Sequence, residues 1–200
     1  MYQIEGCPVP VYQDESELNR LVELVKKLKP KRILEIGSLH GGTLWYWMQN
    51  VPGAEIISVD SGVQAFDGRF SDIEYARINL WPEWERETGC TIIQIRADST
   101  APVTVEEARK YAPFDFIFID GGHDYNTAMS DWNSYWPMLR DGGLLAFHDI
   151  AYPDNNPDNY AVGAVWRAIR DNGNWQEIIR EHNPEGIWGI GVMWKDSNDS

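Results

Sequence analysis

Basic residues and cysteines are both scarce in this sequence of 200 residues. Lysine and arginine number 17 against 31 aspartates and glutamates, which gives a net charge of −14 at neutral pH. Because nucleic-acid binding depends on cationic contacts to phosphate, we expect no nucleic-acid partner. The two cysteines, Cys7 and Cys90, lack metal-ligand spacing. We expect free thiols in a reducing, cytoplasmic compartment.

Long apolar runs are also missing. No segment approaches the roughly 18–20 apolar residues that a membrane span needs, so we expect no membrane partner. The first ten residues have neither the basic nor the apolar region of a signal peptide. The length and the 43% hydrophobic content are typical of one globular domain. We assign residues 1–13 to a leader or lid, 14–195 to a single domain and 196–200 to a polar tail.

Tryptophan, by contrast, is abundant, with ten residues. Two interpretations stay open for these side chains: core packing, or the lining of a flat apolar or sugar-binding pocket. The residues concerned are Trp45, Trp47, Trp81, Trp84, Trp132 and Trp136. An exposed aromatic patch would in addition favour a homo-oligomer.

Strand-like apolar runs alternate with helix-like segments along the chain, which predicts an α/β fold with a mostly parallel sheet. Strands are expected at residues 32–37, 54–60, 91–98, 114–120, 144–150, 175–183 and 187–195. The last two are close enough to form an antiparallel hairpin, so the seventh strand should run against the others. Pro82 predicts a kink or break in the helical segment 72–89. Asp14 should begin the first helix, with Glu17 as its capping-box partner.

The segment 114–150 carries the candidate chemistry. It holds two apolar runs that end at Asp120 and Asp149, with His123 and His148 beside them. Ligands of open α/β sheets bind beyond the carboxyl ends of the strands, so these four side chains should meet at one edge. A second interpretation stays open for His148. Side chains alternate along a regular strand, so His148 could face away from Asp149 and from the site.

A glycine-containing loop, EIGSLHGGT, follows the first expected strand. Leu39 stands where a dinucleotide fingerprint has its second glycine, so the loop suits a nucleoside better than a pyrophosphate. Asp60 ends the second strand, where a carboxylate can accept two ribose hydroxyls. Asp98 and Ser99 end the third strand and could reach an adenine edge. Together these strand ends predict a nucleoside-containing ligand.

These strings, with FIDGGHDY and the terminal hairpin, resemble class I S-adenosylmethionine-dependent methyltransferases, and in particular the small metal-assisted O-methyltransferases that act on catechols, sugars and natural products. The resemblance covers about residues 30–195 and implies a Rossmann-like three-layer sandwich. It also implies S-adenosylmethionine as cofactor and a small hydroxylated acceptor. The cofactor residues implied are Glu35, Gly37, Ser38, Gly41, Asp60, Ser61, Asp98, Ser99 and Asp120.

The same resemblance implies a divalent metal, held by Asp120, His148 and Asp149, where family members commonly have an acid in place of His148. Two carboxylates suit Mg²⁺, and an added imidazole shifts the preference toward Mn²⁺ or other transition metals. His123 is the candidate general base, because its ordinary pKa suits proton transfer at neutral pH. The alternative for His123 is a loop residue that caps the following helix.

Our principal hypothesis is therefore a metal-assisted O-methyltransferase. A non-catalytic cofactor-binding module and an NAD-linked oxidoreductase are the rivals. Acceptor specificity should lie in residues 1–13, 61–71 and 151–159.

Overall fold

The computed structural model describes residues 4–62, 70–153, 160–182 and 188–196. Parts of the three expected specificity segments lie outside the described residues, and so do the expected hairpin turn at residues 184–186 and the end of the polar tail.

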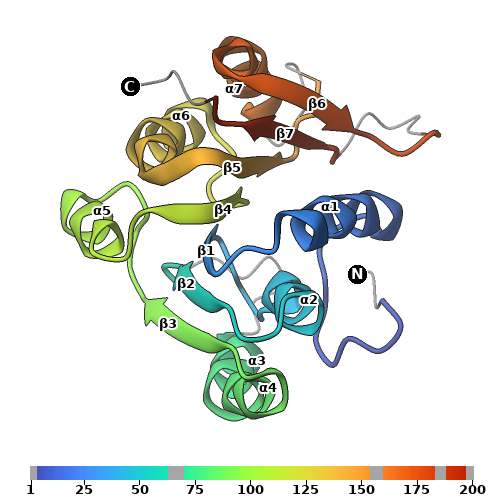
Figure 1. Ribbon diagram of the computed structural model, residues 1–200, viewed down its shortest axis with the longest axis vertical. Coiled ribbons are helices and arrows are strands. Elements are labelled where there is room, and N and C mark those ends of the chain that lie inside the picture. The colour runs from blue at the N-terminus through green and yellow to red at the C-terminus, as the bar shows by residue number, and fades with distance from the viewer. Residues whose placement is uncertain (1–3, 63–69, 154–159, 183–187, 197–200) are drawn as a thin grey trace.

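Seven strands form one sheet between two layers of helices (Figure 1). The strand order is β3-β2-β1-β4-β5-β7-β6, and β7 runs antiparallel to both of its neighbours. The strands are β1 (Arg32–Ile36), β2 (Glu55–Val59), β3 (Thr91–Ile95), β4 (Phe114–Ile119), β5 (Leu139–His148), β6 (Asn174–Ile178) and β7 (Ile190–Trp194). The α-helices are α1 (Glu15–Leu28), α2 (Gly42–Asn50), α3 (Phe70–Tyr75), α4 (Trp81–Thr88), α5 (Pro102–Arg109), α6 (Tyr125–Tyr135) and α7 (Val162–Ile169). The predicted Rossmann-like fold with an antiparallel last strand is confirmed.

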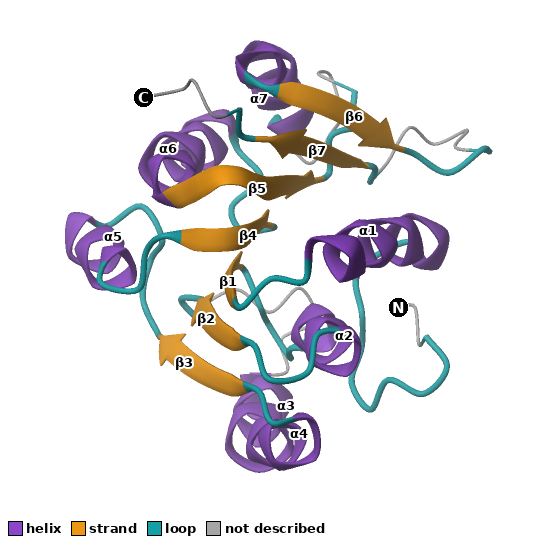
Figure 2. Cartoon of the chain, viewed as in Figure 1, coloured by secondary structure: helices purple, strands orange, loops and turns teal. Residues whose placement is uncertain are grey.

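Each face of the sheet is covered by helices, as Figure 2 shows. Ile33 and Phe116 pack in the core beneath α1 and α2, whereas Leu34 and Ile117 pack in the core beneath α5, α6 and α7. Successive strand residues point to opposite faces, so the apolar runs supply both cores at once. The carboxyl edge of the parallel strands is left for ligands.

Several strand boundaries differ from the sequence prediction, since β3 ends at Ile95 and β6 at Ile178, earlier than expected. Strand β5 begins at Leu139 rather than at residue 144, and its pairing with β4 shifts register between Phe114 and Phe116. Gly142, at φ +66°, accommodates the irregular backbone that joins the two parts of the strand. The expected break at Pro82 is present: a π-helical turn, Ala76–Leu80, separates α3 from α4, which carries Pro82 in its first turn.

Most of the six singled-out tryptophans belong to the core. Trp47, Trp81, Trp84 and Trp132 are buried, which supports the packing interpretation for these four. Both cysteines are buried free thiols, as expected. Within the described ranges, no helix combines the length and apolarity needed to cross a bilayer.

Asp14 caps α1 as predicted, but Glu17 is not its capping-box partner. Asp14 accepts hydrogen bonds from the backbone N–H groups of Ser16 and Glu17. The Glu17 carboxylate is fully buried and accepts instead from the backbone N–H of Arg180 at 2.8 Å and of Gly189 at 2.9 Å. Burial raises the pKa of Glu17. Glu17 thus ties α1 to the ends of the terminal hairpin.

Replacing Glu17 with alanine should destabilise the fold by about 2–4 kcal/mol, because two backbone donors lose their acceptor. Urea unfolding measures the change. Glu15→Ala, in the same first turn but exposed, is the matched control and should cost well under about 1 kcal/mol. Equal losses in both variants would contradict the assigned role of Glu17.

Candidate functional site

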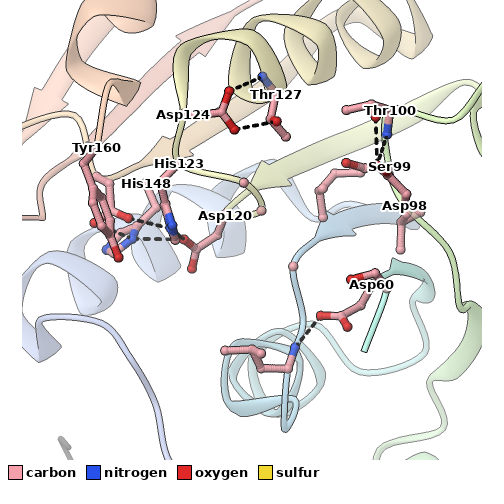
Figure 3. A pocket seen from close by; sticks show the side chains of 18 of the residues that line it. Asp60, Asp98, Ser99, Thr100, Asp120, His123, Asp124, Thr127, His148 and Tyr160 are labelled. Atoms are coloured by element: carbon pink, nitrogen blue, oxygen red, sulfur yellow. Dashed lines mark hydrogen bonds and ion pairs between the residues drawn. The ribbon is translucent and has the colours of Figure 1, made fainter. Parts of the chain in front are cut away.

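A cavity of about 870 Å³ opens at the carboxyl edge of β1, β2, β3, β4 and β5. Nine of the sequence-predicted site residues line it: Gly37, Asp60, Ser61, Asp98, Ser99, Asp120, His123, His148 and Asp149. Figure 3 shows Asp60 and Asp98 at one end, His123 and His148 at the other, and Asp120 between them. The structure therefore brings the two predicted groups into one pocket.

Gly37 allows the ends of β1 and β4 to approach each other. Its φ is +88°, and a Cβ atom there would lie 2.0 Å from the carbonyl oxygen of Asp120. The backbone N–H of Asp120 donates to Ile36 at 2.9 Å, which fixes the approach. A side chain at position 37 would therefore collide with backbone rather than with a movable group.

Glu35, Ser38 and Gly41 do not line the cavity, although direct cofactor contacts were expected from them. The buried Glu35 carboxylate accepts from Thr43 Oγ1 at 2.8 Å and from Trp47 Nε1 at 2.5 Å, and burial raises its pKa to about 8. Ser38 Oγ accepts from Ser58 Oγ, and a Cβ at Gly41 would collide with the Trp81 ring. These residues hold the glycine loop in place from its core side. Side chains alternate along a strand, so Glu35 points into the core rather than into the cavity.

Asp60 reaches the cavity with most of its acceptor capacity in use. Its carboxylate accepts from the backbone N–H of Leu39 at 2.8 Å and of Gly62 at 2.7 Å, and it pairs with Arg77 at 2.8 Å. A carboxylate has about four acceptor positions, so roughly one is left for a ligand. The sequence did not indicate Arg77, because the 16 residues between it and Asp60 carry no motif.

Asp98 and Ser99 form the adjacent wall. The Asp98 carboxylate accepts from the backbone N–H and the hydroxyl of Thr100, at 2.9 and 2.8 Å, which fixes the turn. The carbonyl of Ser99 accepts from the Tyr135 hydroxyl at 2.7 Å. Ser99 is thereby held beyond the carboxyl end of β3, where the sequence predicts a contact with an adenine edge.

Asp131 lies fully buried in α6, close behind this wall. Burial raises the pKa of Asp131 to about 7. A hydrogen bond with the Ser99 side chain lowers this pKa, and the nearby carboxylate of Asp98 raises it. Its folded-state pKa thus lies above the unfolded value of about 3.9. The folded protein binds more protons between these values, so Asp131 lowers stability as the pH rises from about 4 to 7.

Asp131→Asn should therefore be more stable than the parent by up to about 4 kcal/mol at pH 8, with the gain disappearing below about pH 4. Denaturant unfolding at both pH values measures this. Asp124→Asn is the control: Asp124 caps the same helix, and its pKa is lowered by Thr127, so it should give no gain at pH 8. A gain from Asp131→Asn that is equal at both pH values would contradict the burial argument.

The ends of β4 and β5 bring two carboxylates and two imidazoles together. Asp149 follows β5 at φ +64°, so the strand has already ended and His148 and Asp149 can both face the site. His123 Nε2 lies 3.0 Å from Asp149 Oδ2, and His148 Nδ1 lies 3.2 Å from both Asp120 Oδ1 and Asp149 Oδ1. Gln13 Nε2 donates to Asp120 Oδ2 at 2.7 Å.

Among the described residues, ligand atoms of Asp120, His123 and Asp149 converge within 4.8 Å of one another. Two carboxylates and one imidazole fit Mg²⁺ or Mn²⁺. The geometry thus brings His123 into the converging set in place of the expected His148. His148 lies behind the carboxylates, buried, and its Nε2 has no hydrogen-bond partner within the described part of the chain.

The carboxylates change the protonation of both imidazoles. Burial alone would lower the pKa of His123, but Asp120 and Asp149 outweigh it and raise the pKa to about 9. The pKa of His148 is likewise raised well above its ordinary value, and that of Asp149 is lowered by the facing imidazoles despite its burial. In this arrangement His123 holds a proton at neutral pH, contrary to the ordinary pKa assumed from the sequence.

Four aromatic residues that the sequence did not single out line the same end of the cavity: Tyr12, Tyr152, Tyr160 and Trp188. None of the six tryptophans considered for a pocket lies there. The leader contributes Tyr12 and the buried Gln13, so its described part is a wall of the site. The sequence indicated Tyr12, Gln13 and Tyr152 only through the segments 1–13 and 151–159 in which specificity was expected, because no motif marks the individual residues.

The sequence profile of the methyltransferase domain family matches residues 34–150, more than half of the chain. One similar solved structure is an O-methyltransferase from Bacillus cereus in complex with S-adenosylhomocysteine (SAH), with 20% identity over 93% of this chain and 84% of that one and a TM-score of 0.61. Another is TomG from Streptomyces achromogenes in complex with S-adenosylmethionine (SAM), with 15% identity over 97% of this chain and 84% of that one and a TM-score of 0.64. MycE, from the mycinamycin pathway and bound to Mg and SAH, is 20% identical over 91% of this chain and 50% of that one, with a TM-score of 0.57.

Two curated relatives are uncharacterised: y4gI of Sinorhizobium fredii, 23% identical, and R132 of Acanthamoeba polyphaga mimivirus, 26% identical. The matches cover 76% and 69% of this chain but only 17% and 59% of those proteins. The family profile runs from within β1 to just beyond the end of β5, and this part supplies all of the described cavity lining except Tyr12, Tyr152, Tyr160 and Trp188. The chain belongs to the methyltransferase domain family.

Proposed function

We propose that this protein transfers a methyl group from S-adenosylmethionine to a hydroxyl oxygen of a small acceptor, assisted by a divalent ion. The observation that carries the proposal is the continuity of one cavity between the nucleoside-type strand ends and the cluster of Asp120, His123 and Asp149. The SAM and SAH complexes named above support the cofactor, and the Mg in MycE supports the ion.

In this proposal the two ends of the cavity have separate tasks. Asp60, Asp98 and Ser99 bind the nucleoside of the cofactor. Gly37 has no side chain, so the cofactor can come close to the backbone there. The acceptor lies at the other end, near His123. Holding the two reactants in line is the main requirement of a displacement at a methyl group.

The chemical step needs a deprotonated oxygen. A divalent ion on Asp120 and Asp149 would orient the acceptor hydroxyl and lower its pKa. If the ion were held by the two carboxylates alone, with His123 outside its coordination, the pKa of His123 would fall toward its ordinary value and Nε2 could accept the hydroxyl proton. The S–CH₃ bond breaks as the O–CH₃ bond forms, leaving S-adenosylhomocysteine and a methyl ether.

Calorimetry of S-adenosylmethionine binding, after chelation and with Mg²⁺ and Mn²⁺ returned separately, tests cofactor and metal together. We expect binding that metal strengthens, and SAH release when a hydroxyl acceptor is added. Cofactor binding without transfer to any acceptor in a broad panel would favour a non-catalytic binding module. Absence of cofactor binding would refute the proposal.

A further inference from the structure

A buried ion pair behind the cofactor end of the cavity limits how a ribose can be bound there. We propose that Arg77 occupies one oxygen of the Asp60 carboxylate, so that Asp60 accepts a hydrogen bond from only one of the two ribose hydroxyls of the cofactor. Arg77 is then a positioning residue that acts through Asp60. This inference rests on the proposed function, because it takes the nucleoside of S-adenosylmethionine to lie beside Asp60.

The first argument is the number of acceptor positions left on Asp60, which lies at the cavity wall just beyond the end of β2 (Figure 3). A carboxylate offers about two positions on each oxygen. Oδ1 accepts from the backbone N–H of Gly62 at 2.7 Å and lies 2.8 Å from Nη2 of Arg77. Oδ2 accepts from the backbone N–H of Leu39 at 2.8 Å. Among the described residues Oδ1 is therefore fully covered, and one position remains on Oδ2.

The second argument is that Arg77 is fixed where it lies. Its side chain is only 3% exposed, and it belongs to the π-helical turn Ala76–Leu80. The guanidinium carbon is 5.4 Å from the centre of the Trp81 ring, and Trp81 Nε1 donates to the carbonyl of His40 at 2.9 Å. A buried guanidinium that left its carboxylate would be an uncompensated charge. We therefore expect Arg77 to stay on Asp60 when the cofactor binds.

The contact between Arg77 and Asp60 is one of charge and close packing. Nη2 and Nε of Arg77 are buried and meet no acceptor in hydrogen-bond geometry within the described ranges. At 2.8 Å from Oδ1, however, Nη2 fills the space that a ligand hydroxyl would need on that oxygen. Arg77 does not line the cavity, so its effect on a ligand should pass through Asp60 alone.

Unequal recognition of the ribose follows from this arrangement. Two neighbouring hydroxyls can share a free carboxylate, one on each oxygen, as the sequence alone suggested for Asp60. With Oδ1 covered, one hydroxyl donates to Oδ2 and the other depends on water or on another group. Loss of a hydrogen bond to a charged group in a largely buried site weakens binding about tenfold or more. Loss of the other hydroxyl should cost much less.

Calorimetry with SAH and with its 2′-deoxy and 3′-deoxy analogues tests the inference. We expect one analogue to bind at least tenfold more weakly than SAH and the other to bind within about threefold of it. Equal losses, or no loss with either analogue, would overturn the inference while leaving the proposed function in place. Failure of SAH itself to bind would refute both. Unequal binding without methyl transfer to any acceptor would support the inference and count against the proposed function.

Variants of Arg77 test its part in this asymmetry. Arg77→Met removes the guanidinium and returns a position on Oδ1, so the analogue that the parent tolerates should now bind at least about fivefold more weakly than SAH. Arg77→Lys keeps a cation beside Asp60 and should retain the asymmetry of the parent. Arg77→Gln, whose shorter neutral side chain also uncovers Oδ1, replaces Arg77→Met if urea unfolding shows that Arg77→Met is not folded.

Arg96→Met is the matched control, because Arg96 pairs with Glu74 and does not line the cavity. It should bind SAH and both analogues as the parent does. If the neutral variants of Arg77 kept the asymmetry of the parent, Arg77 would not be its cause. A loss of asymmetry in Arg96→Met as well would also contradict the assigned role of Arg77.

Discussion

Asp149→Asn is expected to fold normally and to lose methyl transfer by about 10³-fold. Asparagine adopts the left-handed backbone at φ +64° as readily as aspartate does, so the change removes charge without strain. The lost carboxylate lies 3.0 Å from His123 and 3.2 Å from His148, and it belongs to the converging metal-type cluster. Single-turnover methyl transfer with saturating cofactor and acceptor measures the effect.

Asp171→Asn is the control for Asp149→Asn, because Asp171 is exposed and is not among the residues that line the cavity. Cofactor binding by Asp149→Asn should persist but no longer be strengthened by metal, since the nucleoside contacts lie at the opposite end of the pocket. Full methyl transfer by this variant would remove Asp149 from the mechanism. Calorimetry with Mn²⁺ should in addition show loss of metal affinity.

Gly37→Ala should destabilise the protein by about 3 kcal/mol or more and abolish cofactor binding. The added Cβ would meet the Asp120 carbonyl carbon at 2.6 Å and its oxygen at 2.0 Å, and both atoms belong to backbone held in the sheet. The strand ends would have to separate, which deforms the cofactor end of the cavity and moves Asp120. Urea unfolding and calorimetry measure the two consequences.

Gly53→Ala isolates the conformational part of this effect. Gly53 has a similar φ of +80°, but a Cβ there would meet nothing within 4 Å. The expected cost is only about 1 kcal/mol, from the left-handed backbone alone. If the two alanine variants lost equal stability, the close approach at Gly37 would not be the cause.

The sequence predicted the sheet because each buried strand is short, apolar and ended by a polar residue. The sequence left open whether His148 faces away from Asp149, and the structure answers this because β5 ends at His148. The start of β5 at Leu139 was not predicted, because the strand passes through Asp141 and two glycines that read as a turn.

The missed residues share one property: their partners are distant in sequence. Gln13 bonds to Asp120, Glu17 bonds to Arg180 and Gly189, and Arg77 pairs with Asp60. Local pattern carries no information on such contacts, since the fold alone brings the partners together. The glycine loop shows the converse, because its motif was recognised but Glu35 and Ser38 serve packing rather than the cavity.

The bonds made by Gln13 and Glu17 have a consequence for synthesis on the ribosome. Their partners follow 107, 163 and 172 residues later, so these early residues leave the ribosome long before Asp120, Arg180 and Gly189. At about 5–20 residues per second, α1 waits on the order of ten seconds or more for its last partner. Helix α1 is therefore made well before the residues it docks against, and the cavity is complete only after Trp188 and Gly189 have been synthesised.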